Sequence, residues 1–254
     1  MNAHVLPFLR RLPCSCVIVA ATLVPVAHAD PGPAEDAWRV QATPYAWLSG
    51  LDGTVKPFRS APSVHVSKSG SELLENLDAA AFLTASARRG SFVMQGDLTH
   101  ASTSDSAGLP FGLTARAKVR QTSVTLTAGR TVAPSEQARV DLMAGLRYWD
   151  INAAVSVPGV VAARSGSRFV DPVAAVRWRH ALGPRWSSIV HGDVGGFGVG
   201  SKVTWQAMAL GNYQATDRLF VSVGYRHLSL DYTDDGRRLD FALSGPLAGL
   251  TYVF

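Results

Sequence analysis

The sequence is poor in cysteine and in long apolar runs. Of its 254 residues only Cys14 and Cys16 are cysteines, and both lie near the N-terminus. If that segment is removed on export, the rest of the chain can form neither a disulfide framework nor a cysteine-ligated metal site. The single candidate for a spanning helix runs from Leu12 to about Val26, and it is shorter than the ~20 apolar residues that a membrane-crossing helix needs.

The apolar run instead fits a secretory signal peptide. Arg10 and Arg11 precede it, and Ala27-His28-Ala29 follows it as a small-x-small cleavage site. We therefore predict a signal peptide over residues 1–29, cleaved after Ala29, and a short periplasmic lead-in over residues 30–37. An uncleaved anchor is disfavoured by the short run. A lipoprotein is disfavoured because both cysteines come too early in it.

Clustered charge and the common catalytic motifs are also missing. Without the two leader arginines, 22 Lys and Arg face 19 Asp and Glu, a net charge of +3. These charges are dispersed, so we predict no nucleic-acid partner. HExxH and GxSxG do not occur. The glycines over 195–200 lack the Lys-Ser/Thr pair and helix of a phosphate-binding loop, so we interpret them as a flexible outer loop. We predict no metal and no cofactor.

What the chain has instead is a period of two. Over residues 38–49 one face carries Trp38, Val40 and Leu48, and the other carries Arg39, Gln41 and Thr43. Such alternation is typical of a strand with one apolar and one polar side. It recurs near 91–100, 139–150, 168–182, 186–195 and 203–214.

Short turns and longer loops alternate along the chain. The turns fall at 87–90, 133–136, 182–185 and 215–218, and the loops span roughly 50–79, 101–112, 152–167, 195–202 and 232–238. Together they predict about ten strands over residues 38–254, although eight or twelve would also fit. The weakest strand is 79–88, where Phe82 blurs the polar face. Ser69 and Glu72 resemble a capping box, which predicts a short helix in the first loop.

The strand near 113–130 changes phase. Val124 and Leu126 occupy even-numbered positions, as do Arg116, Lys118 and Arg120, so in a regular strand apolar and basic residues would share one face. Two explanations stay open: a bulge resets the register, or the upper part of this strand stands clear of the bilayer.

The alternation could also belong to a soluble barrel with an apolar interior, but two features favour lipid outside. Short turns and long loops alternate as they do in membrane barrels. Apolar-face aromatics gather at the turn ends as an interfacial girdle. Its members are Trp38, Phe92, Trp178, Trp186, Tyr213, Tyr252 and Phe254. The predicted fold is all-β: a closed antiparallel transmembrane β-barrel with short periplasmic turns and longer outer loops.

The last predicted strand places Phe254, Tyr252 and Leu250 on one apolar face. This pattern resembles the strand that the barrel-assembly machinery reads, so we predict that machinery as a partner during biogenesis. In the outer membrane, the other partners would be membrane lipid and lipopolysaccharide. The oligomeric state stays open.

The polar face carries charges of both signs on most strands. In a narrow lumen such charges could neutralise one another through charge-assisted hydrogen bonds, with Tyr45, Trp47 and Trp149 adding bulk. The candidate lumen charge network is Arg39, Asp97, Asp141, Arg147, Arg177, Arg179, His191, Asp193 and Arg226.

Several stretches resemble a proteobacterial family of outer-membrane β-barrels whose members are mostly hypothetical proteins. The clearest is Pro44-Tyr45-Ala46-Trp47-Leu48-Ser49-Gly50-Leu51-Asp52-Gly53. Others are Ala144–Trp149, Gly192–Gly198, Gly224–Arg226 and Gly245-Pro246. The resemblance implies a porin-like barrel in the outer membrane of a Gram-negative bacterium, and it implies no substrate and no catalytic residues.

Three function classes stay open. The first, which we favour, is a non-enzymatic barrel, structural or a narrow solute channel with a largely filled polar lumen. The second is an outer-membrane protease or lipid-modifying enzyme, in which a histidine with nearby carboxylates activates water; His191 with Asp193, and His227 with Asp231, each share a strand face. The third is a surface adhesin or binding barrel that uses the long first loop.

Overall fold

The structure is a computed structural model that describes residues 37–254 apart from 57–58, 60–62, 109–113, 136 and 160. The predicted signal peptide and its cleavage site lie outside the described residues. No helix in the described part is long and apolar enough to cross a membrane. The elements are β1 (Arg39–Trp47), β2 (Gly50–Lys56), β3 (Val64–Lys68), α1 (Gly70–Glu75), β4 (Leu77–Arg89), β5 (Phe92–Gly108), β6 (Thr114–Pro134), β7 (Ala138–Val157), β8 (Val161–Ala181), β9 (Trp186–Gly195), β10 (Val203–Gln214), β11 (Leu219–Asp234) and β12 (Arg237–Val253).

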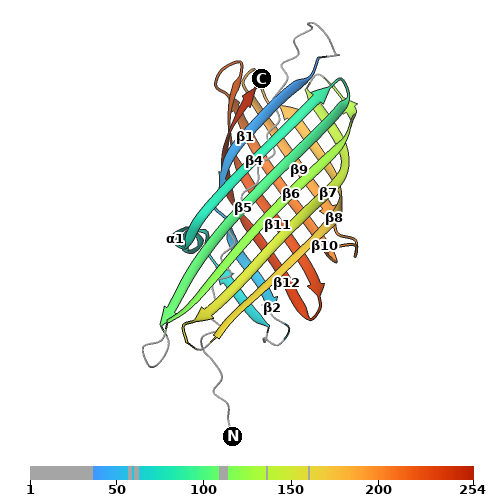
Figure 1. Ribbon diagram of the computed structural model, residues 1–254. Helices are drawn as coiled ribbons and strands as arrows, with labels where there is room; N and C mark the ends of the chain where they lie inside the picture. Colours follow the sequence, from blue (N-terminus) through green and yellow to red (C-terminus); the bar gives the residue numbers. More distant parts are fainter. Residues whose placement is uncertain (1–36, 57–58, 60–62, 109–113, 136, 160) are drawn as a thin grey trace.

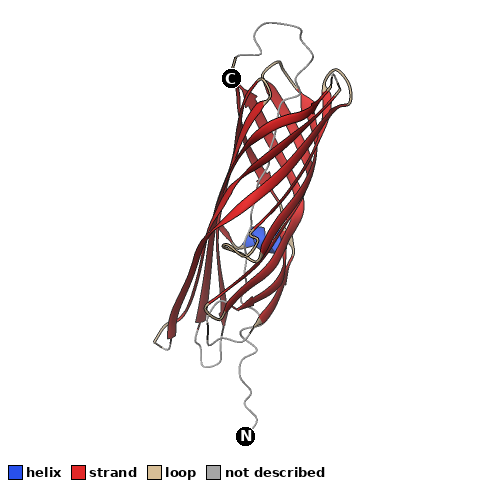
Figure 2. Cartoon of the chain, turned by 90° about the vertical axis from the view of Figure 1, so that its right-hand side faces the viewer, coloured by secondary structure: helices blue, strands red, loops and turns tan. Residues whose placement is uncertain are grey.

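The described residues form a closed antiparallel barrel of ten strands, β1 and β4 to β12 in chain order, and β12 pairs back onto β1. Figures 1 and 2 show tilted strands wrapping a tall, narrow cylinder. In the turn-side half each strand of the ring is paired on both sides, which satisfies the backbone where no water is present. The all-β barrel prediction is confirmed.

The first predicted loop contains further structure. β2 continues along β12 on the loop side of β1, and β3 pairs with β2, so both strands lie outside the ten-strand ring. Ser69 caps α1, and Glu72 returns its side chain to the Ser69 backbone, which confirms the predicted capping box. Leu73 of α1 is fully buried in the apolar cluster of the lumen.

The apolar strand faces point outward. On β7, Leu142 and Leu146 are at least half exposed, whereas their neighbours Asp141 and Arg147 are buried. The predicted girdle residues lie together at the turn end, where Trp38 meets Phe92 edge-on and Trp186 packs against Tyr213. A band of apolar side chains therefore surrounds the turn-side half of the barrel, as a lipid-facing surface requires.

Three strands are much longer than their patterns predicted. β5, β7 and β8 have 17, 20 and 21 residues and run through most of the predicted loops 101–112 and 152–167. β6, with 21 residues, follows the predicted strand 113–130 and extends it into the predicted turn 133–136. The pairing of β6 with β7 is continuous from Arg116 to Thr131. No bulge therefore separates Arg120 from Val124, and the basic residues share the outward face with the apolar ones, farther from the turns.

The hairpin between β9 and β10 differs from the expected flexible loop. It is a tight turn, with hydrogen bonds from Gly198 N to Ser201 O and from Val199 N to Gly196 O. Gly196 and Gly198 have positive φ angles, which glycine adopts at little cost. β9 and β10 are also short, with 10 and 12 residues, so the barrel wall is lower here than at β7 and β8 (Figure 1).

The lumen has two halves of different chemistry. Its turn-side half holds the buried charged side chains, with a small apolar cluster of Val93, Met143 and Ala175 among them. Its loop-side half holds a dense apolar cluster that includes Trp47, Trp149, Leu230 and Leu243, where Phe169 of β8 stacks on Tyr232 of β11 with ring centroids 4.1 Å apart. The expectation of a polar lumen therefore needs correction: the loop-side walls approach one another and exclude water like an ordinary protein core.

Candidate functional site

A buried hydrogen-bond network crosses the middle of the lumen; we call it the central network. Arg147 of β7 donates to Asp193 of β9 at 2.8 Å, and His191 lies 3.2 Å from the same carboxylate oxygen. Gln206 of β10 donates to Asp193 and accepts from Arg226 of β11. The network thus joins β7, β9, β10 and β11.

Arg226 carries the central network to the opposite wall. Its guanidinium lies 3.9 Å from Asp97 of β5 and 5.2 Å from the centre of the Trp47 ring. Asp97 also accepts hydrogen bonds from Tyr45 at 3.2 Å and Thr84 at 2.8 Å. β5 and β11 are nearly opposite in the ring, so this chain of contacts spans the whole lumen.

A second network, which we call the turn-side network, lies nearer the turn end of the barrel than the central network. Asp141 of β7 accepts from Arg177 of β8 at 2.8 Å and from Arg88 of β4 at 2.6 Å. Arg177 also donates to Gln95 of β5 at 2.6 Å. Because each carboxylate has charged donors, and each bond is shielded from water, these contacts are of the strong, charge-assisted kind.

The structure distributes the nine predicted network residues unevenly. Asp97, Arg147, His191, Asp193 and Arg226 meet in the central network, and Asp141 and Arg177 meet in the turn-side network. Arg179 is buried beside Arg177 on the inward face of β8. Arg39 is exposed at the turn-side rim and lies outside both networks, because it is the first residue of β1, where it pairs with Arg88 at the turn end.

Sequence reasoning missed several members. The sequence pattern predicts a turn at Arg88, whereas β4 continues through it to Arg89. Gln95, Gln206 and Thr84 are uncharged, so a search for charged residues does not find them. Their alternation with apolar residues along the strand is the signal that places them on the polar face.

The remaining histidines lie apart from this arrangement. His227 faces outward, packs on Trp205 and pairs with Ser244 at 2.7 Å. Its supposed partner Asp231 contacts Lys202 instead. Among the described residues, no group of three or more His, Cys, Asp or Glu is placed to hold a metal ion. His191 with Asp193 is therefore the one predicted histidine–carboxylate pair that the described structure brings into contact.

The predicted assembly residues line the outside of β12. Leu250, Tyr252 and Phe254 are all exposed, and the rings of Tyr252 and Phe254 lie 5.0 Å apart. The Phe254 backbone N–H donates to the Val40 carbonyl at 3.0 Å. These residues thus flank the seam between β12 and β1 that closes the barrel.

Comparisons with known proteins agree on the fold. No family model matches the chain, and no curated protein matches it. Among solved structures, the chain is similar to the outer membrane protease OmpT from Escherichia coli, with a TM-score of 0.55 and 11% identity over 85% of this chain and 97% of that one. It also matches the translocator domain of the autotransporter NalP from Neisseria meningitidis (TM-score 0.49, 10% identity, 89% and 91% covered) and Ail, the attachment invasion locus protein of Yersinia pestis (TM-score 0.35, 10% identity, 86% and 99% covered). The likeness to OmpT shows that the chain has the fold of a bacterial outer-membrane β-barrel.

Proposed function

We propose that this chain is a non-enzymatic outer-membrane β-barrel with a closed lumen, which serves as a structural element of the membrane rather than as an open pore. The observation that carries the proposal is the central network. It joins strands on opposite walls through side chains that are almost wholly inaccessible to solvent. A barrel of ten strands is close to the size at which side chains fill the interior.

The apolar cluster supports the same proposal from the loop side. Trp149, Leu230 and Leu243 are fully buried there, and the stacked rings of Phe169 and Tyr232 bridge the walls. A hydrated solute would meet this cluster from one side and the central network from the other. A general porin path for sugars or peptides is therefore disfavoured.

Conductance in planar bilayers tests the proposal. Purified, refolded protein should give no large, stable steps. The double variant Asp97→Ala/Arg226→Ala, which removes the bridge between opposite walls, should raise ion leakage. The matched variant Asp150→Ala/Arg168→Ala removes an equally charged pair from the outer surface and should leave conductance unchanged. Large, stable steps from the wild-type protein would overturn the closed-lumen proposal.

The enzyme alternative depends on His191 and Asp193. A general base must reach its substrate, yet both side chains are buried inside the central network rather than at a rim. We therefore expect no hydrolytic activity. A hydrolytic activity that disappears in His191→Ala, while the heat-modifiable band shows an intact barrel, would establish an enzyme.

Export is part of the same proposal. The basic, apolar and Ala27-His28-Ala29 segments favour cleavage after Ala29 and delivery to the outer membrane. N-terminal sequencing of protein extracted from outer membranes should begin at Asp30. A mature protein that retains Cys14 and Cys16 would contradict the cleavage.

A further inference from the structure

Three basic residues follow one another on the outward face of β6 beyond the apolar band. Arg116, Lys118 and Arg120 are all exposed, and alternate residues of a strand are about 6.6 Å apart. The outward face of this strand is apolar nearer the turns, at Val124 and Leu126. The basic row therefore begins just past the band that would contact hydrocarbon, at the depth expected of lipid headgroups.

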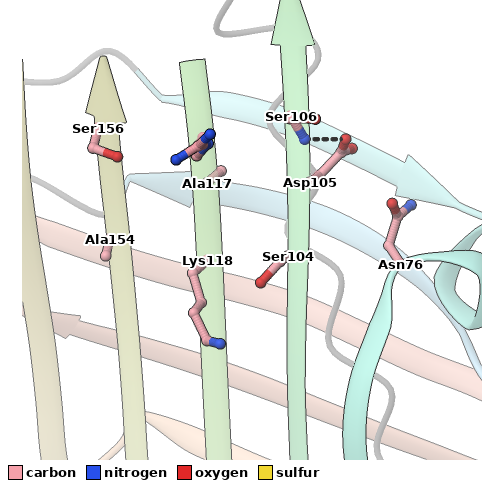
Figure 3. A pocket seen from close by; sticks show the side chains of 9 residues that line it. Asn76, Ser104, Asp105, Ser106, Ala117, Lys118, Ala154 and Ser156 are labelled. Atoms are coloured by element: carbon pink, nitrogen blue, oxygen red, sulfur yellow. Dashed lines mark hydrogen bonds between the residues drawn. The ribbon is translucent and has the colours of Figure 1, made fainter. Parts of the chain in front are cut away.

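The neighbours of this row are small on both sides. Ser106, Ser104 and Ser102 of β5 stand opposite Arg116, Lys118 and Arg120 in turn. Ser156, Ala154 and Asn152 of β7 stand opposite the same three residues. Figure 3 shows Lys118 between Ser104 and Ala154, over a hollow lined by short side chains. The basic groups are thus accessible from outside and are flanked by short polar side chains. Ser102 and Ser104 donate to Asp78, and Asn152 donates to Asp150, which leaves the hydroxyls of Ser106 and Ser156 beside Arg116.

The surrounding charges leave this face positive. Arg164 and Arg168 of β8 add two further basic groups beside the row. Three carboxylates oppose the five cations: Asp78 lies 3.0 Å from Lys118, Asp150 lies 3.0 Å from Arg168, and Asp105 accepts from the Ser106 backbone. The net charge of +2 resides mainly on Arg116, Arg120 and Arg164, for which no carboxylate lies within ion-pair distance in the described residues.

We propose that this face, which we call the basic outer face and define as Arg116, Lys118 and Arg120 with Arg164 and their small neighbours, binds the phosphate groups of lipopolysaccharide in the outer leaflet. The inference rests on the proposed outer-membrane location. Guanidinium groups pair with phosphate through two parallel hydrogen bonds. Ser106 and Ser156, which flank Arg116 on the two neighbouring strands, would contact sugar hydroxyls of the same headgroup.

The position of the face selects a lipid rather than a soluble anion. The basic row is continuous with the apolar wall of the same strands, so a ligand held there can place acyl chains against Val124 and Tyr148 while its phosphates meet the cations. Each basic residue at a membrane surface adds to the attraction for anionic lipid, and their contributions combine. A free phosphate would gain only the second of these contacts.

Lipid retention tests the proposal. Wild-type protein, refolded in a non-ionic detergent, is incubated with purified lipopolysaccharide, repurified, and assayed for bound phosphorylated lipid. The variant Arg116→Gln/Lys118→Gln/Arg120→Gln should retain at least about tenfold less lipopolysaccharide than the wild type. The control Arg130→Gln/Arg185→Gln/Arg218→Gln removes the same charge from exposed residues near the turn end and should retain the wild-type amount. Both variants must first show the wild-type heat-modifiable band.

Two further arms fix the chemistry. Enzymatically dephosphorylated lipopolysaccharide should be retained as poorly by the wild type as intact lipid is by the triple variant. Excess inorganic phosphate at constant ionic strength should not displace bound lipid. Equal loss of lipid in the triple variant and its control, or equal retention of phosphorylated and dephosphorylated lipid, would overturn the proposal. Failure here with a barrel that is still closed and in the outer membrane would leave the proposed function standing.

Discussion

Asp193 is the residue on which most of the central network depends. Its carboxylate contacts Arg147, His191 and Gln206, and its side chain is 2% exposed. Removing one partner of a buried pair leaves an uncompensated charge, which costs about 3–5 kcal/mol. Asp193→Ala should therefore lower the free energy of unfolding by an amount of this order, measured by urea unfolding of the barrel in lipid vesicles.

Asp150 provides the matched control for this substitution. Its partner Arg168 is 71% exposed on the outer wall, and exposed ion pairs contribute about 1 kcal/mol or less. Asp150→Ala should unfold close to the wild type. If both variants were destabilised equally, or if Asp193→Ala were not destabilised, the buried pair would not have the structural role assigned to it.

Asp171 fixes a single turn in a similar way. Its buried carboxylate accepts from the Ser201 backbone N–H at 2.6 Å and from the Ser201 hydroxyl at 2.9 Å. Leaving a buried donor unsatisfied costs about 1–3 kcal/mol, so Asp171→Ala should release the turn between β9 and β10. Limited proteolysis should then cut within residues 196–200. Asp217→Ala, at an exposed turn of the opposite end, should stay resistant, and a resistant Asp171→Ala would contradict this role.

At the scale of the element, α1 has a pH-dependent cap. Hydrogen bonds from the Ser69 backbone N–H and hydroxyl lower the pKa of Glu72 below its ordinary value of 4.5. A group with a lowered folded-state pKa stabilises the fold above its unfolded pKa, and this contribution is lost as the pH falls through the folded value. Hydrogen-exchange protection of the Glu72 and Leu73 amides, corrected for intrinsic rates, should fall below about pH 4.5.

Two variants separate the cap from a general effect of acid. Glu72→Gln should abolish the drop in protection, because glutamine does not titrate. Glu75→Gln lies in the same helix outside the capping box and should keep it. An unchanged drop in Glu72→Gln would assign the pH dependence to another group.

At the scale of the whole molecule, β12 completes the ring. It pairs with β1 over residues 247–253, and Phe254 reaches Val40 through its backbone. Because the Phe254 ring packs on Tyr252 at the outer seam, Phe254→Ala should slow assembly and increase the unfolded fraction on an unheated detergent gel. Phe197→Ala removes a comparably exposed phenylalanine from the opposite end and should assemble at the wild-type rate. Equal rates for the two variants would argue against a role of Phe254 in assembly.

The sequence by itself determined which residues of a strand share a face. Alternation on β7 is sufficient for this, because a period of two assigns Leu142 and Leu146 to one face and Asp141 and Arg147 to the other. The spacing of turns and loops and the aromatic girdle then predicted that the apolar face points outward. Turn and loop spacing then predicted ten strands, and Ser69 with Glu72 predicted α1, since both signals are local. The lengths of β5, β7 and β8 were not predictable in this way, because beyond the apolar band polar residues occupy both a strand and a loop equally well.

Only the tertiary structure decided what fills the lumen. Parity predicted that Arg147, Asp193 and Arg226 point inward, but which carboxylate meets which guanidinium depends on the stagger of strands that are distant in sequence. The same stagger brings Phe169 against Tyr232 and so makes the loop-side half of the lumen apolar. It also aligns Arg116, Lys118 and Arg120 with small residues on both neighbouring strands. Register across a barrel is a property of all its strands together, and no single strand encodes it.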